Sequence, residues 1–416
     1  MKNSKLLISL IALIIASYNA NAAGYSTGLT STSALANSYA GSAAGAHDIS
    51  DILQNPANLS DLKKGQFIAS ISHLNLDIDV DNASLDGNSD GKELQDVGED
   101  AQIPALYVAM PLTKDLSFGL SVASLFGLAT KYDSGWVASD ISLENNILSI
   151  NINPSLSYKI NDKISIGAGF QTQYAKATFT KSANDLGSPL VKSKGNDWGY
   201  GYNFGLKYNF NDDIKLGVGY RSKITHKFSG STNVANLVIN SDVTFKTDTP
   251  ESITAGLTYQ VKDNLQLAFD TSWTRWSRLQ YMTFNHSKNQ NILNLVNTVK
   301  FKWRDSFLYS LGANYDFNDN LLLRFGTAYE ADAVTNANRN YSVPTGDRIW
   351  LSTGLRYKLS KNLAIDATYV NQLYDNVEVD TSADKINSSL EKKTNSIYGK
   401  FKTRVDVISF GLKVDF

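Results

Sequence analysis

The 416-residue chain contains no cysteine, which excludes a disulfide framework and thiol chemistry. Its formal net charge is only −1, so the composition does not indicate a nucleic-acid partner. Long apolar runs are also missing. The apolar run Leu6 to Ala16 is too short to cross a bilayer as a helix, which needs roughly 20 residues, and no later run is longer. A membrane role must therefore come from strands.

The N-terminus has the pattern of an export signal. Lys2 and Lys5 supply the positive start, the apolar run follows, and Ala20-Asn21-Ala22 forms a small-x-small cleavage site. We therefore predict a signal peptide over residues 1–22 and a mature chain that begins at Ala23.

Alternating apolar and polar residues dominate the remaining chain. At the C-terminus, Phe410, Leu412, Val414 and Phe416 occupy every second position. Successive side chains of a strand point to opposite faces, so such a segment is apolar on one face and polar on the other. Together with the export signal, this pattern predicts an all-β protein, a bacterial outer-membrane β-barrel.

Short polar turns allow the strands to be counted. Turns are predicted at Pro111–Asp115, Asn161–Lys163, Asn211–Asp213, Lys262–Asn264, Asn318–Asn320 and Ser360–Asn362. Six turns imply twelve strands, and strands near 66–80 and 402–416 bring the total to fourteen. An even number places both termini on the periplasmic side and the long loops outside the cell. These loops are expected at 81–101, 181–196, 229–245, 285–299, 331–346 and 376–397.

Aromatic residues are expected at the strand ends, where amphipathic rings meet lipid headgroups. The group comprises Trp136, Trp198, Tyr200, Trp273, Trp276, Trp303, Tyr315 and Trp350.

Residues 23–64 do not alternate and are rich in Ala, Ser and Gly, with weak helical spacing. A fourteen-stranded barrel has a lumen wide enough to need filling. We therefore predict a small helical hatch over 23–64 and a barrel over 65–416. Asn55, Pro56 and Ala57 close the hatch, because proline ends a helix. A periplasmic tail is the alternative.

The predicted third strand is irregular. Alternation fails from Leu125 to Ala129, where both faces become apolar, and glycine inside a strand often marks a bend. A bend there would open a gap in the wall at Phe126, Gly127 and Leu128. The alternative is a strand end above the membrane.

Because side chains alternate between the two faces of a strand, several charged residues are expected to face the lumen. Among them are Arg221, Arg324 and Arg348. Opposite charges in a lumen can pair with each other. Alternatively, one or two of these cations hold a substrate carboxylate.

With these features in place, the chain resembles the FadL family of outer-membrane transporters for long-chain fatty acids and other hydrophobic compounds. The resemblance covers nearly all of the mature sequence. It rests on Ser33–Gly41 and Asn55-Pro56-Ala57, Phe126–Thr130 with Trp136, the runs 151–170 and 199–230, the Trp273/Trp276 pair, Trp303-Arg304-Asp305, and Pro344–Tyr357.

The resemblance implies passive, gradient-driven passage without a cofactor or ion coupling. A hydrophobic molecule would enter through a groove, reach a pocket near the mature N-terminus, and leave sideways at the third-strand kink. The family also leads us to expect a basic group near Lys176, although parity puts this side chain on the lipid side. The family's Gly-Arg-Tyr-like stretch after Trp136 is replaced by Val137-Ala138-Ser139. We expect a monomer surrounded by outer-membrane lipid and lipopolysaccharide.

Other functions compete with this one. An enzyme needs a nucleophile oriented by a base and a third group, and the four histidines show no such arrangement. They also form no cluster with metal-ligand spacing, so no metal site is predicted. A general diffusion porin and a surface adhesin are the remaining alternatives.

Overall fold

The computed structural model describes residues 25–85, 87–89, 93–182, 190–235, 239–288, 298–339, 341–380 and 397–416. The predicted signal peptide and the predicted mature start at Ala23 lie outside the described residues, as does most of the predicted 376–397 loop.

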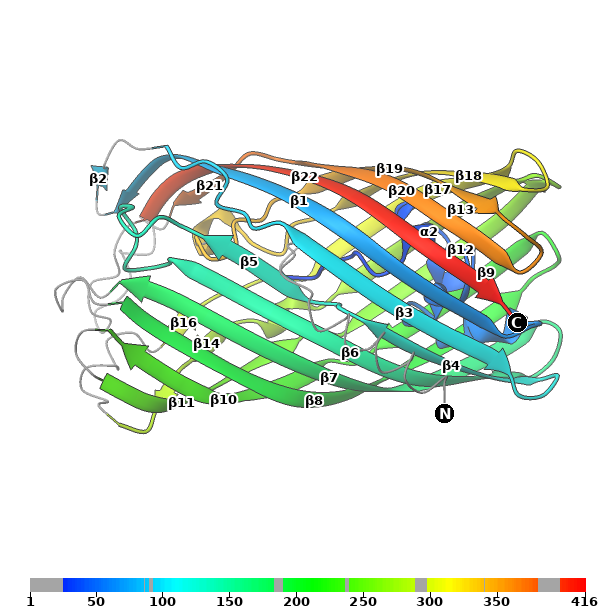
Figure 1. The fold of residues 1–416 in the computed structure, drawn as a ribbon, viewed down its shortest axis with the longest axis horizontal. Helices are drawn as coiled ribbons and strands as arrows, with labels where there is room; N and C mark the ends of the chain where they lie inside the picture. Colours follow the sequence, from blue (N-terminus) through cyan, green and yellow to red (C-terminus); the bar gives the residue numbers. More distant parts are fainter. Residues whose placement is uncertain are drawn as a thin grey trace.

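Antiparallel strands form a closed barrel, because the last strand, β22 (Ile397–Asp415), pairs with the first, β1 (Gln66–Leu85) (Figure 1). This confirms the predicted fourteen-stranded barrel. The third, seventh and eighth wall strands are each divided into two, as β4/β5, β9/β10 and β11/β12. The remaining wall segments are β3 (Ala101–Pro111), β4 (Leu116–Ala123), β5 (Gly127–Lys131), β6 (Glu144–Lys159), β7 (Ile164–Ser182), β8 (Leu190–Asn209), β9 (Ile214–Arg221), β10 (Ile224–Val234), β11 (Ile239–Thr249), β12 (Ser252–Lys262), β13 (Leu265–Thr274), β17 (Ser306–Asp316), β18 (Leu321–Glu330), β19 (Arg348–Lys358) and β20 (Leu363–Tyr374).

Shorter strands extend this wall at one end. β2 (Asn88–Ser89) pairs with β1, β15 (Asn285–His286) with β11, and β21 (Val377–Asp380) with β22. β14 (Tyr281–Thr283) and β16 (Thr298–Lys300) form a separate two-stranded sheet. Within the described ranges, no helix combines the length and apolarity needed to cross a membrane.

All six predicted turns join neighbouring wall strands. Three of them share one local cause, an asparagine side chain that accepts hydrogen bonds from backbone amides two and three residues later. Asn161 Oδ1 accepts from Lys163 and Ile164, at 2.9 Å each. Asn211 and Asn318 do the same in their turns.

Two predicted loops are largely strand. Residues 229–245 are predicted to be a loop, but β10 and β11 pair from Ile224–Thr249 to Val234–Ile239. Likewise, β8 begins at Leu190, inside the predicted 181–196 loop. Their polar composition is misleading because these parts of the strands lie beyond the apolar outer band, where polar side chains cover the outside.

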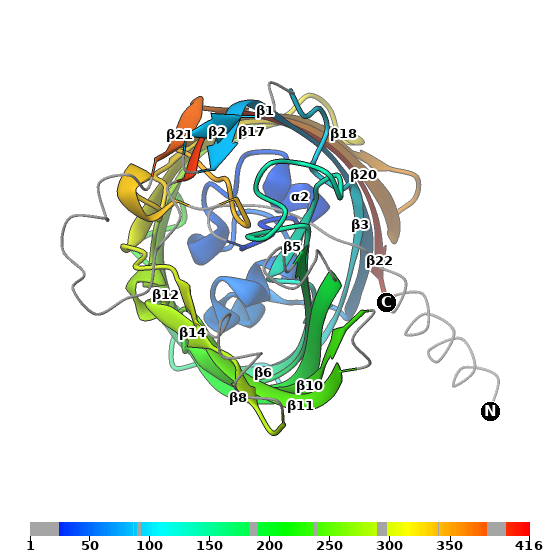
Figure 2. The ribbon, with the colours of Figure 1, turned by 90° about the vertical axis from the view of Figure 1, so that its left-hand side faces the viewer.

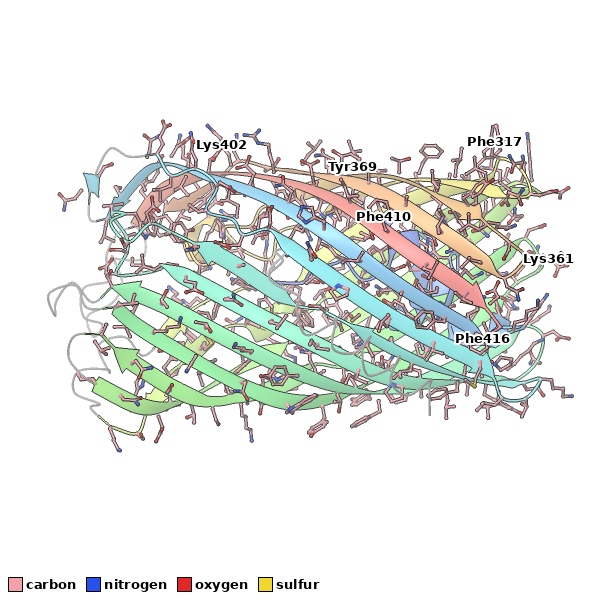
Figure 3. The ribbon with its side chains drawn as sticks, in the orientation of Figure 1. Phe317, Lys361, Tyr369, Lys402, Phe410 and Phe416 are labelled. Carbon is pink, nitrogen blue, oxygen red and sulfur yellow. The ribbon has the colours of Figure 1, made fainter. Side chains whose placement is uncertain are left out.

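The change of environment along the wall is visible within β22. Ile408 and Phe410 are exposed (48% and 58%) and Ser409 is buried, as expected for an apolar outer surface and a polar lumen. Toward the other end of β22 the apolar residues lie on the opposite face, because Val405 and Val407 are buried on the inner face. Phe410 and Tyr369 lie on the outside at mid-height, whereas Lys402 lies toward the end of the barrel opposite Phe416 (Figure 3). The barrel therefore has an apolar band near its turns and an apolar interior at the opposite end.

The expectation that tryptophans gather at the strand ends is only partly correct. Trp198 is 50% exposed on the outer face, but Trp136, Trp276, Trp303 and Trp350 are at most 3% exposed. These four rings pack inside the barrel because they lie where the interior is apolar.

Residues 25–64 occupy the inside of the ring of strands (Figure 2). They form one short helix, α2 (Thr32–Leu35), and three 3-10 turns, η1 (Ser42–Ala44), η2 (Ile49–Leu53) and η3 (Pro56–Asp61). α2 contacts β19 and β20, η1 contacts β9 and β12, and η3 contacts β6, β7 and β8. We call residues 25–64 the hatch; it touches the wall on several sides.

Candidate functional site

The predicted hatch residues Asn55, Pro56 and Ala57 hold the hatch against the wall. Asn55 Oδ1 caps η3 by accepting from the Ala57 amide at 2.9 Å, and Pro56 starts the turn, where a missing N–H costs nothing. The prediction that these residues close the hatch is wrong, because the turn that begins at Pro56 continues to Asp61. The Asn55 amide group donates to the carbonyl of Ala43 at 2.7 Å and to that of Leu206 at 2.9 Å. A Cβ on Gly205 would lie 1.8 Å from Asn55 Oδ1, so a side chain at 205 would displace the hatch.

A buried charge cluster connects the hatch to β18, β19 and β20. Arg356 contacts Asp48 of the hatch and lies 2.9 Å from Asp366, which also pairs with Arg324 at 3.1 Å. Burial raises the pKa of Asp48, but the charge of Arg356 and hydrogen bonds from Ser33 and Ser50 outweigh it, and the net shift is downward. Arg324 is thus engaged in an ion pair and 1% exposed, which favours the pairing alternative for this candidate.

Two further carboxylates join hatch and wall. Asp61 of the hatch lies 2.6 Å from Lys207 Nζ on β8. Asp270 on β13 accepts from the backbone amides of Gly41 and Ala43, at 2.9 and 3.0 Å. Charged contacts therefore join the hatch to several strands around the lumen.

The third wall strand is interrupted where the alternation fails. β4 pairs with both β3 and β6 up to Ala123, whereas β5 pairs with β6 only from Gly127 onward. In the interval, the start of the hatch takes the place of a wall strand. The Thr27 amide donates to the Leu125 carbonyl at 2.9 Å, and the Gly127 amide donates to the Tyr25 carbonyl at 2.8 Å.

An apolar cavity of about 1190 Å³, including its open mouth, lies beside this interruption. Phe228 and Phe245 stack at 4.7 Å in its wall, and Gln173 and His226 supply polar groups. We call it the apolar cavity. Its apolar lining includes Tyr25, Phe126, Leu128, Ala175, Ala177, Phe179, Phe228, Phe245, Leu279, Met282, Phe284, Val299, Phe301 and Val343.

A more polar cavity of about 990 Å³ shares Phe126 with the apolar cavity as a lining residue. Arg221 and Arg348 line this polar cavity together with Asp270 and Glu330. Arg348 Nε lies 2.8 Å from Glu330 Oε2 and its guanidinium stacks over Trp350. Arg221 contacts Gln171 and donates to the Leu53 carbonyl of the hatch at 2.9 Å. The structure thus brings two of the four predicted cations to one cavity.

Lys176 lies elsewhere. Its side chain is exposed, while its neighbours Ala175 and Ala177 are buried and line the apolar cavity. Lys176 therefore points to the outer face, as parity indicated.

Apart from Phe126, the phenylalanines of the apolar cavity were missed by sequence reasoning, although a signal was present. In β10 and β11, Phe228 and Phe245 alternate with polar neighbours such as Lys227 and Lys246. Apolar residues that face inward and lysines that face outward are typical of a wall segment above the apolar band. The polar residues were given more weight, and they led to the prediction of a loop.

In the part of the chain that is described, groups of three or more His, Cys, Asp or Glu side chains with metal-binding geometry are absent.

A hatch-filled fourteen-stranded barrel with an apolar cavity defines an outer-membrane transport protein. The sequence profile described as "Outer membrane protein transport protein (OMPP1/FadL/TodX)" matches residues 13–416, and the chain belongs to this family. The family consists of channels and transporters, not enzymes.

The chain is similar to characterised relatives over most of its length. It is 26% identical to a long-chain fatty acid transport protein of Escherichia coli, covering 87% of this chain and 90% of the relative. It is 27% identical to outer membrane protein P1 of Haemophilus influenzae, covering 86% and 87%. Among solved structures, a FadL homologue of Pseudomonas aeruginosa shares the fold with a TM-score of 0.83 at 22% identity, covering 94% of this chain and 99% of that one. The toluene transporter TbuX of Ralstonia pickettii superposes with a TM-score of 0.65 at 18% identity, covering 92% and 98%.

Proposed function

We propose that this protein carries long-chain fatty acids, or other hydrophobic molecules, passively across the outer membrane. The observation that carries the proposal is the position of the apolar cavity directly beside the interrupted third strand, with Phe126 and Leu128 in its lining. An acyl chain gains about 0.8 kcal/mol for each CH₂ that leaves water, so the cavity competes well for such a ligand.

The route runs from the apolar cavity past Phe126 and sideways into the bilayer. In this route, the segment Tyr25–Thr27 covers the interval between β4 and β5 and has to move when a molecule leaves. Arg221 and Arg348 in the polar cavity are the cations placed to meet a substrate carboxylate. The termini are periplasmic, the long loops are extracellular, and the barrel is a monomer surrounded by lipid and lipopolysaccharide.

The fatty-acid assignment is supported by the name of the Escherichia coli relative. It is tested by the uptake of labelled oleate in cells that have or lack the protein. Higher uptake with the protein supports the assignment, and equal uptake refutes it. Labelled toluene in the same cells separates aromatic hydrocarbons from fatty acids.

A general diffusion porin is disfavoured by the hatch, which hydrogen bonds and ion pairs attach to β8, β13 and β19. Single-channel conductance separates the two functions. A steadily open, large conductance would favour the porin. Among the described residues, no observation favours adhesion by the loops.

A further inference from the structure

The wall is also interrupted between β8 and β10. Pairing of β8 with β9 ends at Asn203–Arg221, and pairing of β8 with β10 resumes at Asn196–Ser229. Between these points, residues 197–202 of β8 face residues 222–228, and no strand pairing joins these two described segments. On its other edge, β8 pairs with β7 without a break from Tyr208 to Leu190. On the β7 side, β8 is therefore continuous, and the interruption lies on its other edge.

This interruption lies as many residues from its turn as the one in the third strand. β4 runs for 8 residues from its turn before the third strand breaks at Ala123. β9 also runs for 8 residues from its turn before the seventh strand breaks at Arg221. The two breaks thus lie on either side of the β6–β7–β8 panel, whose residues Gln173, Ala175 and Val191 line the apolar cavity.

Side chains replace part of the missing ladder. At the edge of the interval, the Ser222 amide donates to the Tyr202 carbonyl, and the Ser222 hydroxyl accepts from the Tyr202 amide, both at 2.9 Å. Farther along, Asp197 Oδ2 accepts from the Lys227 amide at 3.0 Å and lies 3.3 Å from Nδ1 of His226. Each such contact contributes only about 1 kcal/mol net, and it can break without rearranging the remaining ladder.

The side chains of Ser222, Ile224 and His226 lie against two glycines of β8 in this interval. A Cβ on Gly199 would lie 2.4 Å from Ile224 Cγ2, and a Cβ on Gly201 would lie 2.8 Å from Ile224 Cγ1. Ile224 therefore rests directly on the glycine backbone of β8 and is 2% exposed. Next to it, His226 lines the apolar cavity and contacts Gln173 at 3.0 Å.

On its outer side, the β8 strand of this interval is aromatic, whereas the facing segment carries Lys223, Thr225 and Lys227. Trp198, Tyr200 and Tyr202 are 50%, 62% and 50% exposed, within the band that faces lipid. At this seam, His226 lines the apolar cavity, and Ile224 lies over the glycines of β8.

We propose that the β8–β10 interruption is a second side port between the apolar cavity and the bilayer. Ile224 is its movable plug, and the contact of Asp197 with His226 and the Lys227 amide is its latch. The nature of the molecule that passes rests on the proposed function, whereas the existence of an opening does not.

Opening is measured without any substrate by labelling single cysteines, because the natural chain has none. Ile224→Cys, Phe228→Cys and Val407→Cys variants are reconstituted in vesicles whose lipid contains pyrene maleimide, with glutathione in the water to quench reagent that leaves the bilayer. Val407 is fully buried at a continuously paired position of β22, and Phe228 lies in the apolar cavity.

The thiol of the Ile224→Cys variant should react faster than the thiols of both control variants, because it lies in the seam that opens toward lipid. Labelling of Ile224→Cys as slow as that of Val407→Cys, or slower than that of Phe228→Cys, overturns the port.

The latch is tested in the Ile224→Cys background. Asp197→Ala should increase the labelling rate several-fold, and Asp212→Ala, in an exposed turn, should leave it unchanged. An unchanged rate in Asp197→Ala overturns the latch.

The role in transport is tested with Gly199→Cys/Ile224→Cys, because the close approach of these positions suits a disulfide. Oxidation should remove part of the oleate uptake, and reduction of the same sample should restore it. Phe325→Cys/Thr353→Cys, a facing pair on the continuous β18–β19 ladder, is the oxidised control.

Ile224→Trp, which blocks the seam without oxidation, should also lower uptake. Full uptake by the oxidised Gly199→Cys/Ile224→Cys variant and by Ile224→Trp overturns the transport role. If the natural protein takes up no oleate, the proposed function fails, while the labelling result still decides whether the port exists.

Discussion

The amide of Gly127 donates a 2.8 Å hydrogen bond to the carbonyl of Tyr25, so the first described residues of the chain complete the wall where the third strand is broken. Tyr25 also packs edge-on against Phe126, with ring centroids 5.7 Å apart. One short segment therefore covers the interruption and lines the apolar cavity at the same time.

Replacing Gly127 by valine should reduce transport without preventing folding. A β-branched side chain favours a regular strand and adds bulk at the interruption, where Tyr25 now packs. The measurement is oleate uptake at matched protein levels in the outer membrane. Gly135→Ala is the control, because a Cβ at 135 meets open space. Unchanged uptake in Gly127→Val would refute the side exit at the third strand.

Replacing Gly205 by valine should loosen the hatch. A Cβ at this position would lie 1.8 Å from Asn55 Oδ1, so the capped turn η3 must move away from β8. We expect a larger single-channel conductance than in the natural protein. If the variant keeps both the conductance and the stability of the natural protein, close packing of hatch and wall at this position is contradicted.

Replacing Arg356 by methionine should destabilise the protein strongly. The change leaves the buried Asp48 without its counter-charge, and breaking a buried pair typically costs about 3–5 kcal/mol. Urea unfolding in lipid vesicles measures the loss. Lys159→Met, which removes an exposed pair with Asp162, should change stability far less. Equal effects of the two substitutions would show that the charge cluster does not anchor the hatch.

Acidification should weaken the hatch contacts through Asp48. Its pKa is lowered in the folded protein, so its contribution to stability is fully present above the unfolded value of about 3.9 and is lost as the pH falls toward the folded value. We expect the free energy of unfolding to decrease below about pH 4. Asp48→Asn should flatten this part of the pH profile, and an identical profile in the variant would contradict the assignment.

Truncating Phe245 to alanine should weaken binding of a hydrophobic ligand. The ring belongs to the apolar cavity, and burying a phenylalanine side chain is worth about 1.5–3 kcal/mol. Titration of a fluorescent fatty acid into purified protein measures the affinity. Lys246→Ala, on the exposed outer face of the same strand, is the matched control. Equal affinities in the two variants would place the ligand elsewhere.

Much of the fold was determined by the sequence alone, because alternation and turn chemistry are local. The two-residue period specifies strands, and asparagines such as Asn161, Asn211 and Asn318 specify where hairpins reverse. The failed alternation at Leu125–Ala129 likewise marked the third-strand interruption correctly. Each of these signals depends on side chains only a few residues apart.

Only the tertiary structure decided which face meets lipid, water or a cavity, because one alternating pattern fits all three environments. Phe245 lines a cavity although it was predicted to lie in a loop, and Trp276 and Trp350 are buried inside the barrel instead of lying at headgroup level. The partners of the lumen charges were also beyond sequence reasoning. Asp48 and Arg356 are 308 residues apart in the chain, and closure of the barrel around the hatch brings them into contact.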